Sequence, residues 1–158
     1  MRSSLHLFLA MAASAAVVLA KPEQIRGVTS PIFHYYLQPY PQDPTIPVMG
    51  PEASSQYFNI GSGAIQSANS SAYLTVGSDS TSYKTLKLSP TAGTAPGWAL
   101  EGDTISTGTS SAWGRQLNFL VCKLGGGDYW QVYLQTGSAV PAGKTCSNYQ
   151  SLHLPCLC

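Results

Sequence analysis

Carboxylates are the first residues of this chain to consider for acid–base chemistry, and few of them lie close together. Glu101 and Asp103 form the only close pair in the sequence. A glycosidase needs two carboxyl groups placed across a sugar. The glycine between these two residues instead predicts a tight turn that directs both side chains into solvent. We therefore expect the pair to form a polar hairpin tip.

Histidine could serve a Ser-His-Asp triad, whose members come from distant positions in a chain. After the first twenty residues the chain has two histidines, His34 and His153. No G-x-S-x-G sequence is present, and His153 alternates with Leu152 and Leu154, which predicts the polar face of a strand. No candidate ligands have the spacing of a metal site. We expect a protein that is not an enzyme, with no metal and no cofactor.

Aromatic residues point to a different chemistry, carbohydrate binding. Trp and Tyr rings stack on sugar rings while neighbouring polar side chains bond the hydroxyls. Trp113 and Arg115 lie in a stretch rich in Ser, Thr and Gly, and Asp128 and Tyr129 follow three consecutive glycines. These four residues are the candidate sugar contacts. The remaining tryptophans lie on apolar strand faces and are expected in the core: Trp98 and Trp130.

The N-terminus predicts secretion. Arg2 precedes a mainly apolar stretch from Leu7 to Ala20, and Lys21-Pro22 then begins a polar segment. This order is typical of a signal peptide, residues 1–20, cleaved after Ala20. The stretch is shorter than the roughly 20 residues that cross a bilayer, and no later segment is longer. We therefore expect a secreted protein without a membrane anchor.

The cysteines fit an oxidising compartment. An even number of them predicts two disulfides, and all lie in the last quarter of the chain: Cys122, Cys146, Cys156 and Cys158. The last two are too close to bond each other comfortably. We therefore expect one bridge from Cys122 and one from Cys146, both to the C-terminal tail. A zinc site, the alternative, lacks the usual C-x-x-C spacing.

Composition limits the partners. Without residues 1–20 the chain keeps seven basic and seven acidic residues, and charged residues are only 9% of the whole sequence. A neutral surface gives no electrostatic reason to bind nucleic acid or anionic lipid. Cell-wall polysaccharide or an extracellular protein is the expected partner. The motif Asn69-Ser70-Ser71 predicts N-glycosylation at Asn69.

Residues 21–55 form a Pro-rich N-terminal segment. We expect no helix and no central strand there, because prolines interrupt both; they are Pro22, Pro31, Pro39, Pro41, Pro44, Pro47 and Pro51. The apolar run from Ile32 to Leu37 is expected to lie across the domain or to pair as an edge strand. The remainder is predicted to be extended chain. Trimming after Arg26 is left open.

Residues 56–158 are predicted to be the β domain, with its disulfide-linked tail. Short stretches of alternating apolar and polar residues recur there between turn signals. Their number and spacing predict a single all-β domain of about seven or more short strands. A β-sandwich and a β-trefoil-like barrel are equally compatible with this pattern.

Several short motifs follow one another in the β domain, between Tyr57 and Cys146. They include Tyr57-Phe58-Asn59-Ile60, Gly97-Trp98-Ala99-Leu100, Phe119-Leu120-Val121-Cys122 and Tyr129-Trp130-Gln131-Val132. Their order resembles the small secreted fungal cell wall proteins of the phialide-protein type, some of which are described as IgE-binding antigens. The resemblance implies a fungal cell-surface or secreted role and brings no catalytic residues. The Pro-rich opening and the cysteine-containing end depart from it.

These observations favour a secreted, non-enzymatic protein of the fungal cell wall or extracellular space, with a structural or surface-interaction role. A carbohydrate-binding module that recognises cell-wall polysaccharide is the alternative. A small secreted hydrolase with an unrecognised site is the third possibility.

Overall fold

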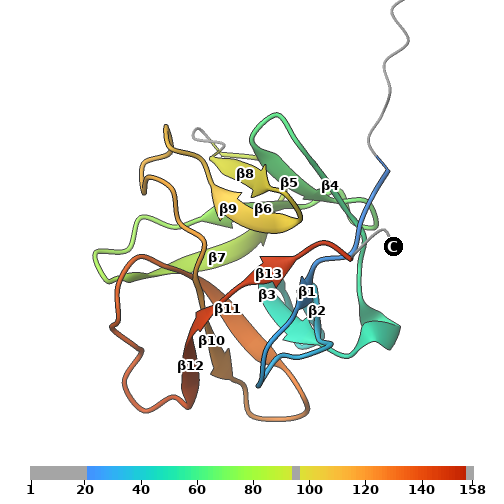
Figure 1. Cartoon of the computed structure of the whole chain (residues 1–158). Helices are drawn as coiled ribbons and strands as arrows, with labels where there is room; N and C mark the ends of the chain where they lie inside the picture. Colours follow the sequence, from blue (N-terminus) through green and yellow to red (C-terminus); the bar gives the residue numbers. More distant parts are fainter. Residues whose placement is uncertain (1–20, 94–96, 156–158) are drawn as a thin grey trace, which may run out of the picture.

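A computed structural model describes residues 21–93 and 97–155, and these form a single all-β domain (Figure 1). The described residues contain thirteen strands, one short 3-10 helix (η1, Glu52–Ser54) and no helix long and apolar enough to span a membrane. The strands are β1 (Arg26–Gly27), β2 (Tyr36–Tyr40), β3 (Asp43–Gly50), β4 (Phe58–Gly61), β5 (Ala64–Ser67), β6 (Tyr73–Val76), β7 (Tyr83–Ser89), β8 (Trp98–Glu101), β9 (Thr104–Thr107), β10 (Phe119–Lys123), β11 (Trp130–Gln135), β12 (Cys146–Gln150) and β13 (Leu152–His153).

The strands pair antiparallel in one continuous sheet that curls into a nearly closed barrel. Neighbours follow the order β4-β5-β6-β7-β11-β3-β2-β1-β13-β9-β8, and β10 pairs with β11 and β12 beside this path. The two ends of the path approach each other, because the backbone N–H of Trp98 in β8 donates to the carbonyl of Gly63 between β4 and β5, at 3.0 Å. The prediction of a single all-β domain is confirmed, and the barrel, rather than the sandwich, is its form.

Alternating side chains build the interior. In β7, Leu86 and Leu88 are buried while Lys87 between them is exposed, as expected for a strand with one apolar face. Full burial of such a side chain stabilises the fold by about 1.5–3 kcal/mol. The buried residues of the main core come from both ends of the chain: Ile25, Ile32, Leu37, Met49, Phe58, Ile65, Leu74, Leu86, Leu88, Trp98, Ile105, Phe119, Val121, Val132, Leu134 and Leu152.

The Pro-rich segment is part of this sheet, so the expectation that it holds no central strand is wrong. Strand β3 lies between β2 and β11 in the sheet. Pro39 and Pro47 stand opposite each other in the β2–β3 hairpin. On its other side, β2 pairs with β1 at Tyr36, and β3 pairs with β11 at Val48 and Met49. Neither pairing reaches the two prolines. A missing N–H is tolerated at such positions because no third strand needs it.

One disulfide is present in the described residues, and it joins Cys122 to Cys146. These cysteines lie directly opposite each other in β10 and β12. The expectation that each is bonded to the C-terminal tail is therefore wrong, because β12 returns along β10, which cysteine spacing alone cannot show. Cys156 and Cys158, like the predicted signal peptide, lie outside the described residues.

Candidate functional site

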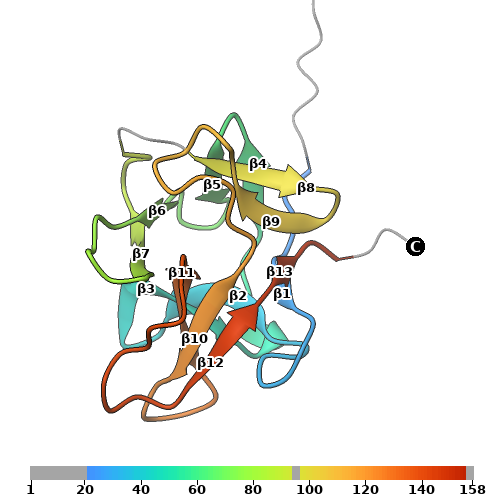
Figure 2. The same ribbon diagram turned by 60° about the vertical axis from the view of Figure 1, so that its left-hand side comes forward.

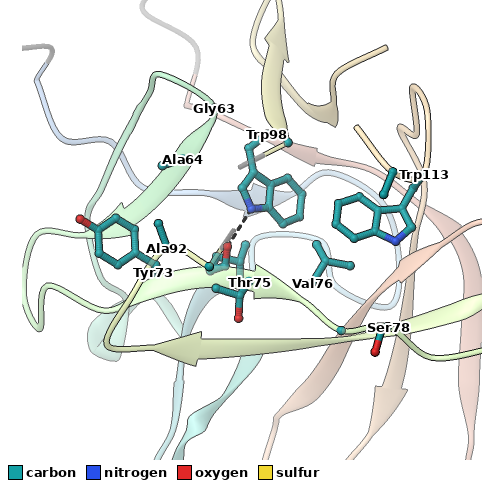
Figure 3. Close-up of a pocket in the computed structure, with 14 residues that line it drawn as sticks. Gly63, Ala64, Tyr73, Thr75, Val76, Ser78, Ala92, Trp98 and Trp113 are labelled. Atoms are coloured by element: carbon teal, nitrogen blue, oxygen red, sulfur yellow. Dashed lines mark hydrogen bonds between the residues drawn. The ribbon is translucent and has the colours of Figure 1, made fainter. Parts of the chain in front are cut away.

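A pocket of about 310 Å³ lies between β6 and the tryptophans of β8 and the β9–β10 loop (Figure 3). Fourteen residues line it, none of them charged or histidine, and half of them are glycine or alanine. The small side chains leave room for three aromatic rings in the wall, which are Tyr73, Trp98 and Trp113.

Trp98 is a fixed part of this wall. It is the first residue of β8 and is only 7% exposed. Its indole Nε1 donates a 2.7 Å hydrogen bond to the carbonyl of Leu74 in β6, and its ring stacks on Phe119 with centroids 6.3 Å apart. Its predicted place in the core is confirmed. Trp130, in contrast, is half-buried at the edge of the core, with Lys123 Nζ 5.3 Å from its ring centroid.

Trp113 comes from the β9–β10 loop, which internal hydrogen bonds hold in place. The Thr107 hydroxyl donates to the Gly114 carbonyl at 2.6 Å, and the Gln116 side-chain amide donates to the Trp113 carbonyl at 2.8 Å. The ring reaches the pocket beside Gly97, where an added Cβ would lie 3.4 Å from Trp113 Cζ3 and 2.9 Å from Ser111 Cβ. Glycine at this position therefore allows the loop to approach β8.

The opposite rim is set by the loop between β6 and β7. The Asp79 carboxylate accepts hydrogen bonds from the backbone N–H of Thr85 at 2.8 Å and from its hydroxyl at 3.0 Å. These bonds, led by the one from the backbone, hold the pKa of Asp79 below its usual range. They fix the loop that brings Gly77 and Ser78 to the pocket.

The structure does not bring the four predicted sugar contacts together. Trp113 lines the pocket, but Arg115 two residues later forms an ion pair with Glu101. Asp128 and Tyr129 belong to the β10–β11 turn, which lies at the other end of the barrel from β8 and β9 (Figures 1 and 2).

The second pair also has other contacts. Tyr129 packs edge-on against Tyr40 with centroids 5.6 Å apart, and the Asp128 carboxylate lies 3.4 Å from Lys123 Nζ. Sugar binding by these residues stays a prediction.

Glu101 and Asp103 form the predicted hairpin tip. Glu101 pairs with Thr104 across the β8–β9 hairpin, and Gly102 in the turn has a φ of +62°, which glycine adopts without strain. The two carboxylates diverge onto different partners. Arg115 bonds Glu101 and lowers its pKa, whereas Asp103 faces His153. Each carboxylate is therefore engaged by its own partner, which does not favour a shared role across a sugar.

His153 lies at the centre of a chain of hydrogen bonds that the sequence did not reveal. Its Nε2 is 2.9 Å from the Ser151 hydroxyl, and its Nδ1 is 3.3 Å from both Asp103 Oδ1 and Thr104 Oγ1. The bond to His153 is the main cause that lowers the pKa of Asp103. The i, i+2 spacing of Ser151 and His153 was a visible signal, but Asp103 joins them only through the fold. None of these residues lines the pocket.

Asn69 is exposed in the β5–β6 turn. Its Oδ1 accepts a 3.1 Å hydrogen bond from the backbone N–H of Tyr57, so the side chain is oriented while the residue stays accessible. Glycosylation there stays a prediction. Within the described residues, no group of three or more His, Cys, Asp or Glu side chains could hold a metal ion.

No protein-family model, curated protein or solved structure matches this chain. The resemblance to fungal cell wall proteins therefore stays a prediction.

Proposed function

We propose that the protein is a secreted, non-enzymatic protein of the fungal cell wall or extracellular space that acts through surface interactions, with the aromatic pocket as its binding site. The observation that carries this proposal is the composition of the pocket, in which aromatic rings meet and no acidic, basic or histidine side chain is among the described lining residues. Such a site can bind a ligand, but it offers no general acid or base. The disulfide between Cys122 and Cys146 supports an oxidising compartment.

Expression of the full chain tests the location. We expect the protein in the culture medium or the cell-wall fraction, with Lys21 as its first residue. Recovery from intracellular fractions alone would contradict secretion. Binding is tested with Trp113→Ala, and Phe33→Ala is the matched control, because Phe33 is 58% exposed and is not among the residues that line the pocket.

Recognition of cell-wall polysaccharide is the alternative function. Trp113 in the pocket favours it, because an indole face stacks on a sugar ring. Sedimentation with insoluble β-glucan and chitin decides this alternative. Binding to either polymer that Trp113→Ala removes and Phe33→Ala keeps would support it, whereas binding to neither would exclude it.

A second candidate function is serine-dependent ester hydrolysis, which the Ser151–His153–Asp103 chain favours. In such a reaction the Ser151 hydroxyl attacks the ester carbonyl while His153 takes its proton, and the alcohol leaves with that proton. Water, deprotonated by His153, then cleaves the acyl-Ser151 ester and releases the acid. We expect no reaction with a fluorophosphonate probe if the protein is non-enzymatic. Labelling of the wild type that both Ser151→Ala and His153→Ala abolish would replace the first proposal by this one.

A further inference from the structure

The side chains of the pocket wall offer few polar partners to a ligand. Thr75 uses its hydroxyl within the sheet, where it lies 3.0 Å from Ser89 Oγ and 3.3 Å from the Lys87 carbonyl. Figure 3 shows the Tyr73 hydroxyl pointing away from the two indole rings. A hexose carries several hydroxyl groups, and each one buried without a partner costs free energy. An enclosed sugar ring is therefore a poor fit.

Three polar side-chain groups of the wall form no hydrogen bond with another described residue, namely the indole N–H of Trp113 and the hydroxyls of Ser78 and Tyr73. Because the Tyr73 hydroxyl points away from the indole rings (Figure 3), the Trp113 N–H and the Ser78 hydroxyl remain as partners for a ligand. A ligand with one or two acceptor groups could pair with them, since an apolar pocket commonly carries a small number of orienting polar groups.

No charged residue is among the described residues of the wall, and Arg115, two residues after Trp113, is paired with Glu101. The ammonium of Lys84, the second residue of β7, donates to the carbonyls of Asp79 and Thr81 in the β6–β7 loop, at 2.5 and 2.6 Å. The Asp79 carboxylate is occupied by Thr85. A charged ligand would lose its hydration in the pocket without gaining an ion pair. The ligand should therefore be neutral.

The volume of the pocket limits the size of the ligand. An apolar cavity of about 150 Å³ holds one benzene molecule, and the pocket measures about 310 Å³. The space fits a molecule of about two rings, and the faces of Trp98 and Trp113 suit flat or CH-rich ring surfaces.

We propose that this pocket binds a small, neutral and largely apolar molecule of about two rings, with one or two acceptor groups for Trp113 Nε1 and Ser78. This inference rests on the proposed function, because it names the ligand class of the same pocket. Trp98 supplies the fixed wall and Trp113 the wall that comes from a loop. A polysaccharide would instead stack on the outer surface of Trp113 without entering.

Calorimetric titration with matched probes tests the ligand class. The probes are naphthol, its charged analogue naphthalenesulfonate, glucose and N-acetylglucosamine. We expect saturable binding of naphthol, at least tenfold weaker binding of the sulfonate, and no binding of either sugar. Trp113→Ala removes one wall. Ala92→Phe fills the pocket while keeping both tryptophans, so it remains informative if Trp113→Ala does not fold.

Both pocket variants should lose naphthol binding, and Phe33→Ala should keep it. Sugar binding that is tighter than naphthol binding and depends on Trp113 would overturn the ligand class but leave the pocket as the binding site. Naphthol binding that Ala92→Phe leaves unchanged would overturn the inference, because the probe would then lie elsewhere. If naphthol, both sugars and the polysaccharides all fail to bind, the pocket is not a binding site, and the proposed function fails with it.

Discussion

The two tryptophans of the pocket show how differently the same residue type can be held. Trp98 is buried, donates its N–H to the carbonyl of Leu74 and stacks on Phe119. Trp113 is half-buried, and its N–H bonds no other described residue. Hydrogen bonding and burial of this kind contribute to folding, whereas an uncommitted N–H is available to a ligand. Trp98 therefore contributes mainly to the stability of the fold, whereas Trp113 is available for ligand binding.

Replacing each indole by a smaller ring separates these roles. Trp98→Phe should lower the free energy of unfolding by about 1–3 kcal/mol, because it leaves the buried Leu74 carbonyl without its Nε1 donor. Trp113→Phe should cost less, because it breaks no hydrogen bond to a described residue. Urea denaturation measures both, with the slope m unchanged. Equal losses would contradict the assignment.

The sequence predicted the burial of Trp98 but not that of every residue on an apolar strand face. Trp98 and Leu100 stand two positions apart, yet Trp98 is buried and Leu100 is 40% exposed. The irregular flanks of Trp113 marked a loop. Ser151 was missed, since its partner Asp103 lies far away in the chain and reaches His153 only through folding. The separation of Asp128 from Trp113 also depends on where two distant turns lie in the barrel. Periodicity carries no information about either distance.

At the scale of elements, the β8–β9 hairpin is tied to the rest of the barrel at its tip. Glu101 bonds Arg115 after the hairpin, and Asp103 bonds His153 of β13. The backbone N–H of Leu154 also donates to the Asp103 carbonyl at 2.7 Å. Since this hairpin carries Trp98 into the pocket, the hydrogen bonds at its tip also help to hold Trp98 in position.

These ties should weaken in acid. The bond from His153 holds the pKa of Asp103 below its ordinary 3.8, and Arg115 holds the pKa of Glu101 below 4.5. A carboxylate with a lowered folded-state pKa stabilises the fold above its ordinary pKa and loses this contribution as the pH falls through the folded value.

We therefore expect the urea midpoint to fall between pH 5 and the acid range below about 4. The double variant Glu101→Gln, Asp103→Asn should show a smaller fall. Glu52→Gln, outside this hairpin, is the matched control and should follow the wild type. An equal fall in the double variant would contradict the role of the tip.

The position of strand β1 in the sheet predicts how the folded chain responds to proteolysis. Arg26 pairs with both β2 and β13, Gly27 pairs with β13, and Ile25 before them is fully buried. The Arg26–Gly27 bond should therefore resist trypsin in the folded protein, and Lys144 in the exposed β11–β12 loop should be cut first. Mass spectrometry of reduced digests, taken at successive times, shows which of the two bonds is cleaved first. Early cleavage after Arg26 would show that β1 opens and that trimming there is possible.

At the scale of the whole molecule, the sequence predicted the all-β class but did not decide between a sandwich and a barrel. Alternation indicates strands, so an all-β domain followed from the sequence. Two-residue strands such as β1 and β13 are too short to show a periodic pattern. The prolines argued against a central strand at β3, because the sequence does not show whether a neighbouring strand needs the N–H group that a proline lacks. Barrel closure depends on the contact between Trp98 and Gly63 at the two ends of the strand path, and local patterns do not encode such a contact.

The disulfide between Cys122 and Cys146 is a covalent constraint on this barrel. It joins positions 24 residues apart and closes the loop that contains β11. Limiting the unfolded chain in this way stabilises a fold by about 3 kcal/mol for a loop of this size. The double variant Cys122→Ala, Cys146→Ala should lose about that free energy of unfolding while keeping the far-UV spectrum of a β protein.

Peptide mapping without reduction should also recover one linked pair that contains Cys122 and Cys146. Recovery of Cys122 linked to Cys156 or Cys158 would instead restore the tail-anchored pairing. In that case β12 could not lie opposite β10 as it does, since the register of the two strands places the sulfur atoms of Cys122 and Cys146 together.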